Sequence, residues 1–412
     1  MSQLTFDPTT PAGAVHALRS TQAIRERAAG LLARARAGES CHFKVNDAAL
    51  VPAARTVAEL TRQNFPALRI PYHSRWRHFE AGQVNRVAQL DDRLGLVSAA
   101  ERARSQIDLA LVSVLLDAGA GPAWRFHEAG SDQTFARSEG LGVASFHAFT
   151  SGLFSSDPAQ PLRVDAAGLA NLTSERLGEA FQVSERNPLV GLEGRTQVLR
   201  RLGEALRARA DVFGAIGRPG ALFDALHTGP TLEAHTILSA LLATLSDIWP
   251  AQNAIDGMAL GDCWPHPAVP GAGLTAGWMP FHKLSQWLTY SLLEPFEWAG
   301  VRVQGLDALT GLPEYRNGGL LIDAGVLQPL PADHATRTWH AGDAFIVEWR
   351  ALTVSLLDEI APLVRAELGL SAAQMPLACV LEGGTWAAGR EWAQRLRGGL
   401  PPFQIASDGT VF

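Results

Sequence analysis

An acid, a phenol and an arginine occupy consecutive positions in the segment LTGLPEYRNGGLLIDAG, residues 309–325. Glu314, Tyr315 and Arg316 directly precede Asn317, two glycines and an apolar run. A carboxylate beside Tyr-Arg can act as an acid or a base with hydrogen-bonding groups next to it. The same glutamate could instead begin a helix, because a negative charge is favoured at a helix N-terminus. The segment therefore predicts either a catalytic carboxylate or a helix start.

A dense group of polar and aromatic side chains occurs in PYHSRWRHFEAG, residues 71–82. Two arginines on either side of a tryptophan could bind a phosphate while the aromatic ring packs a sugar or a base. The alternative is a surface patch anchored by the tryptophan. The candidate binding residues of this segment are His73, Arg75, Trp76, Arg77 and Phe79.

A lysine lies near the start of FHKLSQWLTYSLLEP, residues 281–295. The apolar residues with helical spacing are Phe281, Leu284, Leu288 and Leu292. Lys283, Gln286 and Tyr290 would then lie together at a different angle. Lys283 could bind a phosphate or lower the pKa of a neighbouring carboxyl, or this face could simply be solvated.

Other carboxylates and metal-binding residue types are scattered more thinly. Glu348 and Arg350 occur in VEWRALTV, and Glu382 occurs in VLEGGTW. Cys263 and His266 have CxxH spacing, but no second such pair follows at the distance of a zinc site. The motifs GxxxxGK[ST], GxGxxG, HExxH and GxSxG are all absent. We therefore expect no metal and no cofactor, and ATP, NAD and acyl-serine chemistry are disfavoured.

Helices must position most of these residues, because apolar residues recur at three- and four-residue steps. In residues 20–38 this pattern ends at Gly38, and in residues 98–119 Ser98 and Glu101 have the spacing of a capping box. Further helices are expected over 193–213, 231–249, 279–294 and 345–368.

Strand signals are few and late. PLACVLEGG (376–384) is a short apolar run between Pro and Gly, and FQIASDGTVF (403–412) has Asp-Gly between apolar residues, which is typical of a hairpin. The Pro/Gly-rich segment 261–280 contains Asp262, two tryptophans and a methionine, so we expect an ordered loop of the kind that covers a site. Without βα alternation or a linker, the sequence predicts a mainly α fold. Residues 1–412 would form a single helical domain with a few short strands near the C-terminus.

Composition excludes several classes of protein. The 412 residues are 47% hydrophobic and 18% charged, which is enough to build a substantial core. A net charge of -6 gives no basic excess for nucleic-acid or membrane binding. The three cysteines do not form a disulfide framework, and no signal peptide or long apolar run is visible. We therefore expect a cytoplasmic protein that binds neither nucleic acid nor membranes.

Longer segments carry a resemblance to one family. They are HSRWRHFEAG, FTSGLFSSDP, PLRVDAAGL, LEGRTQVLRRLGEAL, LGDCWPH, FHKLSQWLTYSLLEP, LTGLPEYRNGGLLID and LEGGTWAAGREWA. Across essentially its whole length the chain resembles the Urc4/Urg3 family of uracil-catabolism proteins. The resemblance implies a role in degrading uracil through its nucleotide and a ribosylurea-type intermediate to urea, with the other enzymes of that route as partners.

A second, fainter resemblance is to queuosine-salvage N-glycosylases, which are helical proteins related in shape to DNA glycosylases. The matching positions are Phe281, Lys283, Gln286, Glu314, Tyr315, Arg316, Glu348, Arg350, Glu382 and Trp386. Glu stands at 314 and 382 where that family has Asp, and GDCWPHPAVPGAG has no counterpart there. The resemblance implies hydrolysis of an N-glycosidic bond.

Together these resemblances imply an N-ribosyl hydrolase that acts on a phosphorylated ribosyl substrate. Its expected catalytic residues are Glu314, acting on C1′ or on water, Glu382 as second carboxylate, and Lys283. Its expected substrate-binding residues are His73, Arg75, Trp76, Arg77, Phe79, Trp124, Asp262, Tyr315, Arg316 and Glu348. Two alternatives remain: a uracil phosphoribosyltransferase, although the usual pyrophosphate loop and sheet pattern are not visible, and a non-enzymatic scaffold for the pathway.

Overall fold

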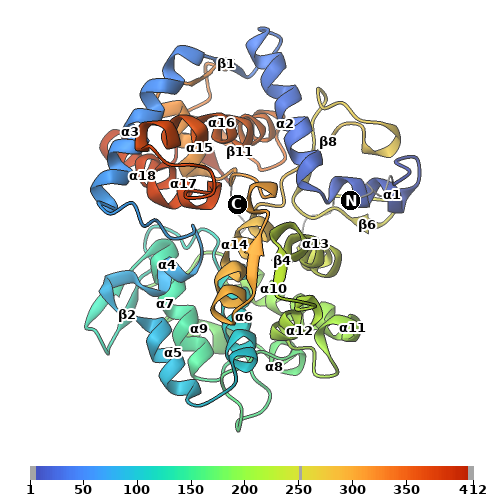
Figure 1. Cartoon of the computed structure of the whole chain (residues 1–412), viewed down its shortest axis with the longest axis vertical. Helices are drawn as coiled ribbons and strands as arrows, with labels where there is room; N and C mark the ends of the chain where they lie inside the picture. Colours follow the sequence, from blue (N-terminus) through green and yellow to red (C-terminus); the bar gives the residue numbers. More distant parts are fainter. Residues whose placement is uncertain (1–5, 250–252, 407–412) are drawn as a thin grey trace. The chain divides into compact units, whose positions relative to one another are not determined.

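Helices account for most of the regular structure in residues 6–249 and 253–406, the part of the chain that the computed structural model describes (Figure 1). Across these residues the strands are two or three residues long and pair only in twos. This confirms the mainly α fold. No helix within the described ranges is long and apolar enough to cross a membrane.

The chain divides into two compact units, each assembled from separate segments of sequence. The first comprises residues 6–73, 253–286 and 306–406 of the described chain, and the second comprises residues 74–249 and 287–305. Helix α14 (Lys283–Trp298) contributes its first turn to the first unit and the rest to the second. The expectation of a single domain is not tested by this division and stays a prediction.

The first unit combines helices from both ends of the sequence, which Figure 1 shows as blue and red ribbons side by side. They are α1 (Pro11–Leu18), α2 (Thr21–Arg36), α3 (Leu50–Asn64), α15 (Tyr315–Asp323), α16 (Ala344–Leu368), α17 (Leu377–Val380) and α18 (Trp386–Arg397). Helix α16 packs against both α2 and α3, and α15 packs against α18. Every residue of α16 from 345 to 357 is buried, as its largely apolar sequence predicts, and this places two charged residues, Glu348 and Arg350, in the interior.

The Pro/Gly-rich segment 261–280 is an ordered hairpin, as expected from its tryptophans and methionine. Strand β7 (Cys263–Pro265) pairs antiparallel with β8 (Trp278–Pro280). Met279 and Val269 are buried in one apolar cluster with residues of α2 and α16, and Trp264 packs against it. Burial of a large apolar side chain stabilises a fold by about 1.5–3 kcal/mol, so this cluster holds the hairpin on the two helices.

Short strands lie near the C-terminus, as expected, and others occur along much of the described chain. In the first unit β1 (Phe43–Val45) pairs antiparallel with β10 (Leu327–Pro329), and β5 (Ala254–Ile255) pairs antiparallel with β6 (Met258–Ala259). Strand β11 (Thr338–Trp339) is parallel to β12 (Gln404–Ile405). The Asp-Gly hairpin expected at 408–409 lies outside the described residues.

The six predicted helices are present, with altered ends. Ser98 caps its helix by accepting a hydrogen bond from the Glu101 N–H at 3.1 Å, as the capping-box spacing predicts. The segment 231–249 begins as a strand and becomes helical at Ala234, and 193–213 is interrupted at Arg209. The strand expected in 376–384 was wrong: this run is helix α17 followed by a π-helical turn, Leu381–Thr385. A short apolar run does not distinguish a buried helix from a buried strand.

The second unit is built around α6 and α10. Its helices are α4 (Trp76–Phe79), α5 (Arg86–Leu94), α6 (Ala99–Leu115), α7 (Arg137–Thr150), α8 (Ala166–Ala170), α9 (Ser174–Ala180), α10 (Leu192–Ala208), α11 (Ala210–Phe213), α12 (Leu222–Leu226) and α13 (Ala234–Leu245). Strand β2 (Phe126–Glu128) pairs with β3 (Gln133–Phe135), and β4 (Thr231–Glu233) pairs with β9 (Arg302–Gln304).

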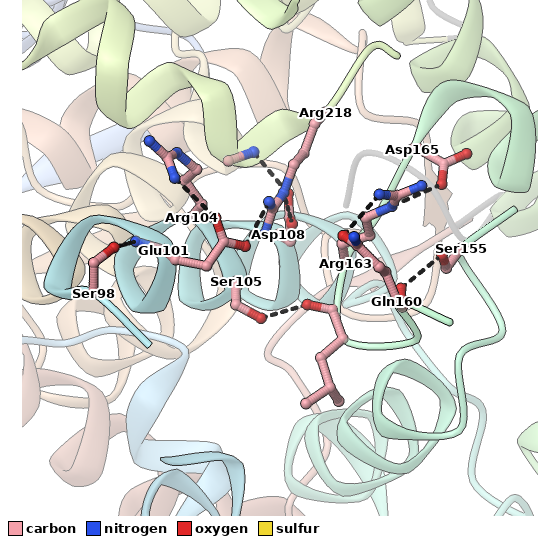
Figure 2. A network of polar contacts seen from close by, with 12 residues as sticks. Ser98, Glu101, Arg104, Ser105, Asp108, Ser155, Gln160, Arg163, Asp165 and Arg218 are labelled. Atoms are coloured by element: carbon pink, nitrogen blue, oxygen red, sulfur yellow. Dashed lines mark hydrogen bonds and ion pairs between the residues drawn. The ribbon is translucent and has the colours of Figure 1, made fainter. Parts of the chain in front are cut away.

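Charged residues on α6 attach neighbouring segments of this unit (Figure 2). Asp108 lies 2.7 Å from Arg218 Nε and also accepts a hydrogen bond from the Gly220 N–H. Glu101, two turns earlier on α6, lies 2.7 Å from the same guanidinium and 2.8 Å from Arg104. Because an unpaired buried charge is costly, this network specifies how the segment 218–220 packs on α6.

Candidate active site

Glu314 is the N-cap residue of α15. Its two carboxylate oxygens accept hydrogen bonds from the backbone N–H groups of Arg316 at 2.7 Å and Asn317 at 2.6 Å. The helix-start interpretation of this glutamate therefore describes its position correctly. The same bonds hold the carboxylate in one orientation, which a catalytic group also needs.

The surroundings of Glu314 shift its proton affinity. Burial raises the pKa of Glu314 above its usual value, although the two backbone N–H groups and the neighbouring Lys283 and His73 act in the opposite direction. Lys283 and His73 thus lie close enough to Glu314 to act on it. A carboxyl with a raised pKa is a candidate general acid.

The second glutamate, Glu382, is bonded to His73. Their atoms Oε2 and Nδ1 are 2.7 Å apart, and the His73 ring lies 5.9 Å from the ring of Trp386. Of this pair, His73 is buried and Glu382 is partly exposed. A carboxylate–imidazole pair can take a proton from water and hold it.

Glu382 lies on the π-helical turn, a local geometry that often occurs at functional sites. The glycines that follow it allow the turn to approach α3. A Cβ atom added at Gly384 would lie 2.5 Å from Val57 Cγ1 and 2.7 Å from the Val57 carbonyl oxygen. The sequence Glu-Gly-Gly is therefore explained by close packing, which keeps the Glu382 backbone fixed.

A buried ion pair connects the parts of this site. Asp262 accepts hydrogen bonds from Arg350 Nη1 at 2.8 Å and Nη2 at 2.7 Å, and also from the backbone N–H of Lys283 at 2.9 Å. Arg350 Nε donates to the carbonyl oxygen of Pro313, the residue before Glu314. Burial opposes ionisation of Asp262, yet the Arg350 guanidinium and these hydrogen bonds hold its pKa well below its usual range. Asp262 thus holds the backbone at Lys283 directly and, through Arg350, the backbone of Pro313 just before Glu314.

Tyr315 and Arg316 follow Glu314 on α15. The Arg316 guanidinium lies 4.8 Å from the centre of the Tyr315 ring, and Nη1 donates to the carbonyl oxygen of Gly399 at 3.2 Å. Arg316 is buried, and Gly389 of α18 leaves room for its backbone. These contacts connect α15 to the segment after α18, and the expected contact of both residues with substrate stays a prediction.

Glu348 faces a different polar group from Arg350, although both lie on α16. It accepts a hydrogen bond from Ser40 Oγ at 2.5 Å, and its other oxygen lies 3.5 Å from His266 Nε2. These residues line a cavity of about 360 Å³. The fainter family resemblance placed Glu348 with Glu314, and that grouping stays a prediction.

The arginine–tryptophan segment belongs to the second unit from Ser74 onward, whereas its residues 71–73 belong to the first. Trp76, Phe79 and Trp124 are fully buried, and each tryptophan Nε1 donates to a backbone carbonyl. Arg75 is also fully buried, with Nη1 3.0 Å from Asp117. These contacts explain the dense cluster as core structure, so the roles of these residues in substrate binding stay predictions.

Arg77 is the more exposed of the two arginines. Its guanidinium lies 2.8 Å from Glu294 and 3.0 Å from Glu80. Arg77 belongs to the second unit, whereas His73, Lys283, Glu314 and Glu382 belong to the first. The expected contact of Arg77 with a phosphate stays a prediction.

Some site residues were less visible in the sequence. The pairing of His73 with Glu382 joins segments about 300 residues apart in the chain, and no spacing rule relates them. Asn317, whose N–H holds Glu314, could have been found from the capping position alone.

Comparison with known proteins agrees with the family resemblance. The chain is 40% identical over 407 residues to the protein named "Protein urg3" of Schizosaccharomyces pombe, covering 96% of this chain and 98% of the relative. It is 40% identical over 379 residues to "Uracil catabolism protein 4" of Lachancea kluyveri, covering 83% of this chain and 85% of the relative. The expected family is therefore confirmed. Since residues 17–412 also match the family described as "Protein of unknown function (DUF1688)", the chain belongs to the DUF1688 family, together with the Urg3 and uracil catabolism 4 proteins.

Proposed function

We propose that this chain acts in uracil catabolism and hydrolyses an N-ribosidic bond. The substrate would be a phosphorylated ribosylurea-type or nucleotide intermediate, and the products urea or base with ribose 5-phosphate. The name of the Lachancea kluyveri relative supports the pathway. The segments that contain Lys283, Glu314 and Glu382 resemble segments of the queuosine-salvage N-glycosylases in the same order. This resemblance supports cleavage of an N-glycosidic bond.

The observation that carries the proposal is the presence of two glutamates with different surroundings in one unit. Glu314 is held by backbone N–H groups and has a raised pKa, whereas Glu382 is hydrogen-bonded to His73. Enzymes that cleave glycosidic bonds commonly divide the work between a protonated and an ionised carboxyl group.

The raised pKa favours Glu314 as the proton donor, in place of the role on C1′ or on water that the sequence suggested. Urea is a poor leaving group as an anion, so its nitrogen or oxygen must be protonated while the C1′–N bond breaks. In this scheme Glu314 gives its proton to the leaving group, and the bonding electron pair moves to the nitrogen. Such general acid catalysis contributes about 10²–10⁴-fold to the rate.

The Glu382–His73 pair would act on water. As positive charge develops at C1′, a water oxygen attacks that carbon and its proton passes to the pair. Proton release from the pair and uptake by Glu314 then restore the starting state. Lys283 would hold the 5′-phosphate of the substrate, and its charge would also tune Glu314.

The proposal is tested by urea release from N-ribosylurea 5′-phosphate by the purified full chain, with UMP as second substrate. Glu314→Gln and Glu382→Gln should each lower kcat by about 10²-fold or more, since each removes a proton-transfer group. Glu391→Gln, an exposed glutamate on α18 in the same unit, is the matched control and should keep full activity.

Two results would overturn the proposal. Consumption of uracil and phosphoribosyl pyrophosphate without urea release would identify a phosphoribosyltransferase. Absence of turnover in every assay by a folded protein would favour a pathway scaffold. Normal turnover by Glu314→Gln would remove the acid role from this residue.

A further inference from the structure

Three metal-ligating side chains meet in the first unit, and none of them is His73, Lys283, Glu314 or Glu382. His42, His266 and Glu348 each offer one ligand atom, and these atoms all lie within 4.8 Å of one another. They come from three segments: His42 precedes β1, His266 follows β7, and Glu348 lies on α16. Each segment is fixed by its own strand pairing or helix packing, so the three side chains meet through the fold.

His266 is the most informative member of this group. Its side chain is only 3% exposed, and its Nε2 atom makes no hydrogen bond. Glu348 Oε2 lies 3.5 Å from this nitrogen. Two ligands of a tetrahedral zinc ion are separated by roughly 3.3 Å, because the metal–ligand distances are about 2.0–2.1 Å. The spacing of these two atoms therefore fits one edge of a zinc site.

The other two residues are arranged to complete such a site. Ser40 Oγ donates to Glu348 Oε1 at 2.5 Å, which orients the carboxylate so that Oε2 faces His266. Outer hydrogen bonds of this kind commonly orient the ligands of a metal. His42 is only partly buried, so its imidazole has room to move the short distance that coordination requires.

The cluster opens onto the cavity of about 360 Å³, which is lined also by Cys41 and Pro267. Two histidines and one glutamate, with a free position facing a cavity, are the donor set of many catalytic zinc sites. We propose that His42, His266 and Glu348 bind a divalent transition-metal ion of the zinc class, with at least one coordination position open to this cavity.

The three proposed ligands lie far apart in the chain, which is why no sequence motif predicted a metal. The CxxH spacing suggested Cys263 as the partner of His266, but Cys263 is buried against α1 in a separate apolar cluster. The partners of His266 are instead far from it in the chain. No spacing motif connects His42 or Glu348 to it.

A metal-free explanation of the same geometry exists. The Ala268 N–H lies 3.2 Å from His266 Nδ1, which places the ring proton on Nε2, facing Glu348. Metal binding at Nε2 requires the ring proton to move to Nδ1. Nδ1 can then no longer accept the 3.2 Å hydrogen bond from the Ala268 N–H. The two explanations differ in whether the cluster holds a metal at all, and a titration separates them.

The experiment is titration of the chelator-treated full chain with Zn²⁺ by calorimetry, and with Co²⁺ by visible absorption. We expect one ion per chain, absorption bands of Co²⁺ in a low-symmetry site, and a rise in Tm when Zn²⁺ is added. His42→Gln and His266→Gln should weaken binding at least about 100-fold, and Ser40→Ala about 10-fold, as the loss of an outer hydrogen bond typically does.

The control is His340→Gln, which removes an exposed histidine of the same unit and should leave the affinity unchanged. His42 is the least buried ligand, so its variant keeps the test valid if the more buried variants fail to fold. Absence of Zn²⁺ binding by the unmodified chain would overturn the proposal. Binding that His42→Gln and His266→Gln leave unchanged would do the same, because the metal would then lie elsewhere.

Discussion

Replacing Asp262 by Asn should destabilise the first unit strongly, because it removes the negative charge that neutralises the buried Arg350 guanidinium. The two side chains form a bidentate pair at 2.7 and 2.8 Å, and only 8% of Asp262 and 1% of Arg350 is exposed. Removing one member of a buried pair costs about 3–5 kcal/mol. Asn also provides one acceptor oxygen where Asp262 serves Arg350 and the Lys283 N–H together.

A matched exposed pair gives the comparison. Arg55 and Glu367 lie 3.0 Å apart in the same unit, with 62% and 36% of their side chains exposed. Glu367→Gln should therefore cost only about 0.2–1 kcal/mol, since solvent screens such pairs. Denaturant unfolding, followed by tryptophan fluorescence, measures both changes on the full chain. Equal costs for Asp262→Asn and Glu367→Gln would refute the reasoning.

The double variant Asp262→Asn/Arg350→Met separates charge burial from packing. It should recover most of the lost stability, because an apolar side chain at 350 removes the buried positive charge that Asp262→Asn no longer neutralises. The pH dependence has a defined sign. The folded-state pKa of Asp262 is lowered, so its stabilisation is present above about pH 3.9, the unfolded value, and is lost as pH falls below it. Asp262→Asn should lack this acid-dependent loss.

Three further predictions test other parts of the structure. Glu128→Gln should cost about 3–5 kcal/mol in denaturant unfolding, because it leaves Arg86 buried without its partner at 2.5 Å. Burial opposes ionisation of Glu128, but hydrogen bonds from Arg86, Ser131 and His147 lower its pKa to about 2. The wild type should therefore lose stability as the pH falls from 4.5 to 2, and Glu128→Gln should lose less over this range. Equal losses would contradict this prediction. Gly384→Ala should lower stability by about 1–3 kcal/mol, measured by thermal melting, because the new Cβ would overlap α3; an unchanged Tm would show that the π-helical turn is not tightly packed. Lys283→Met should move the alkaline limb of the kcat/KM profile to higher pH, because the Lys283 charge lowers the pKa of Glu314; a shift to lower pH would exclude Glu314 as the acid.

Periodicity predicted the helices well because it reports which residues face the core. Ser98 and its partner N–H lie where the capping pattern places them. The same reasoning was incomplete for α14, where Gln286 and Tyr290 were expected on a separate polar face. Both are fully buried, since this helix is covered on several sides. Amphipathic spacing cannot reveal a polar side chain that is buried and hydrogen-bonded inside a core.

The candidate site was predictable only in part. Glu314, Lys283 and Glu382 could be selected because each lies in a segment with a recognisable order of residue types. Their supporting contacts could not be selected in this way, because they join positions far apart in the chain. Arg75 shows a related limit of sequence reasoning. An arginine beside a tryptophan suggested a phosphate site, whereas the structure places its guanidinium 3.0 Å from Asp117 in the interior, and the phosphate role stays a prediction. A sequence shows that an arginine is present, whereas burial decides whether its charge serves a ligand or the fold.

The Asp262 prediction also bears on how the two clusters of the first unit depend on each other. Asp262 and His266 are four positions apart in the hairpin segment, and Glu348 and Arg350 are two positions apart on α16. The hairpin segment and α16 therefore each contribute one residue to both clusters. Loss of the Asp262–Arg350 pair should therefore loosen the hairpin on α16 and weaken both urea release and metal binding. Ser40→Ala, in contrast, removes the hydrogen bonds of Ser40 Oγ to Glu348 and to the backbone N–H groups of His42 and Phe43. It should weaken metal binding while the Asp262–Arg350 pair and Glu314 stay in place. Comparing these two variants in both assays distinguishes a shared support from two independent sites.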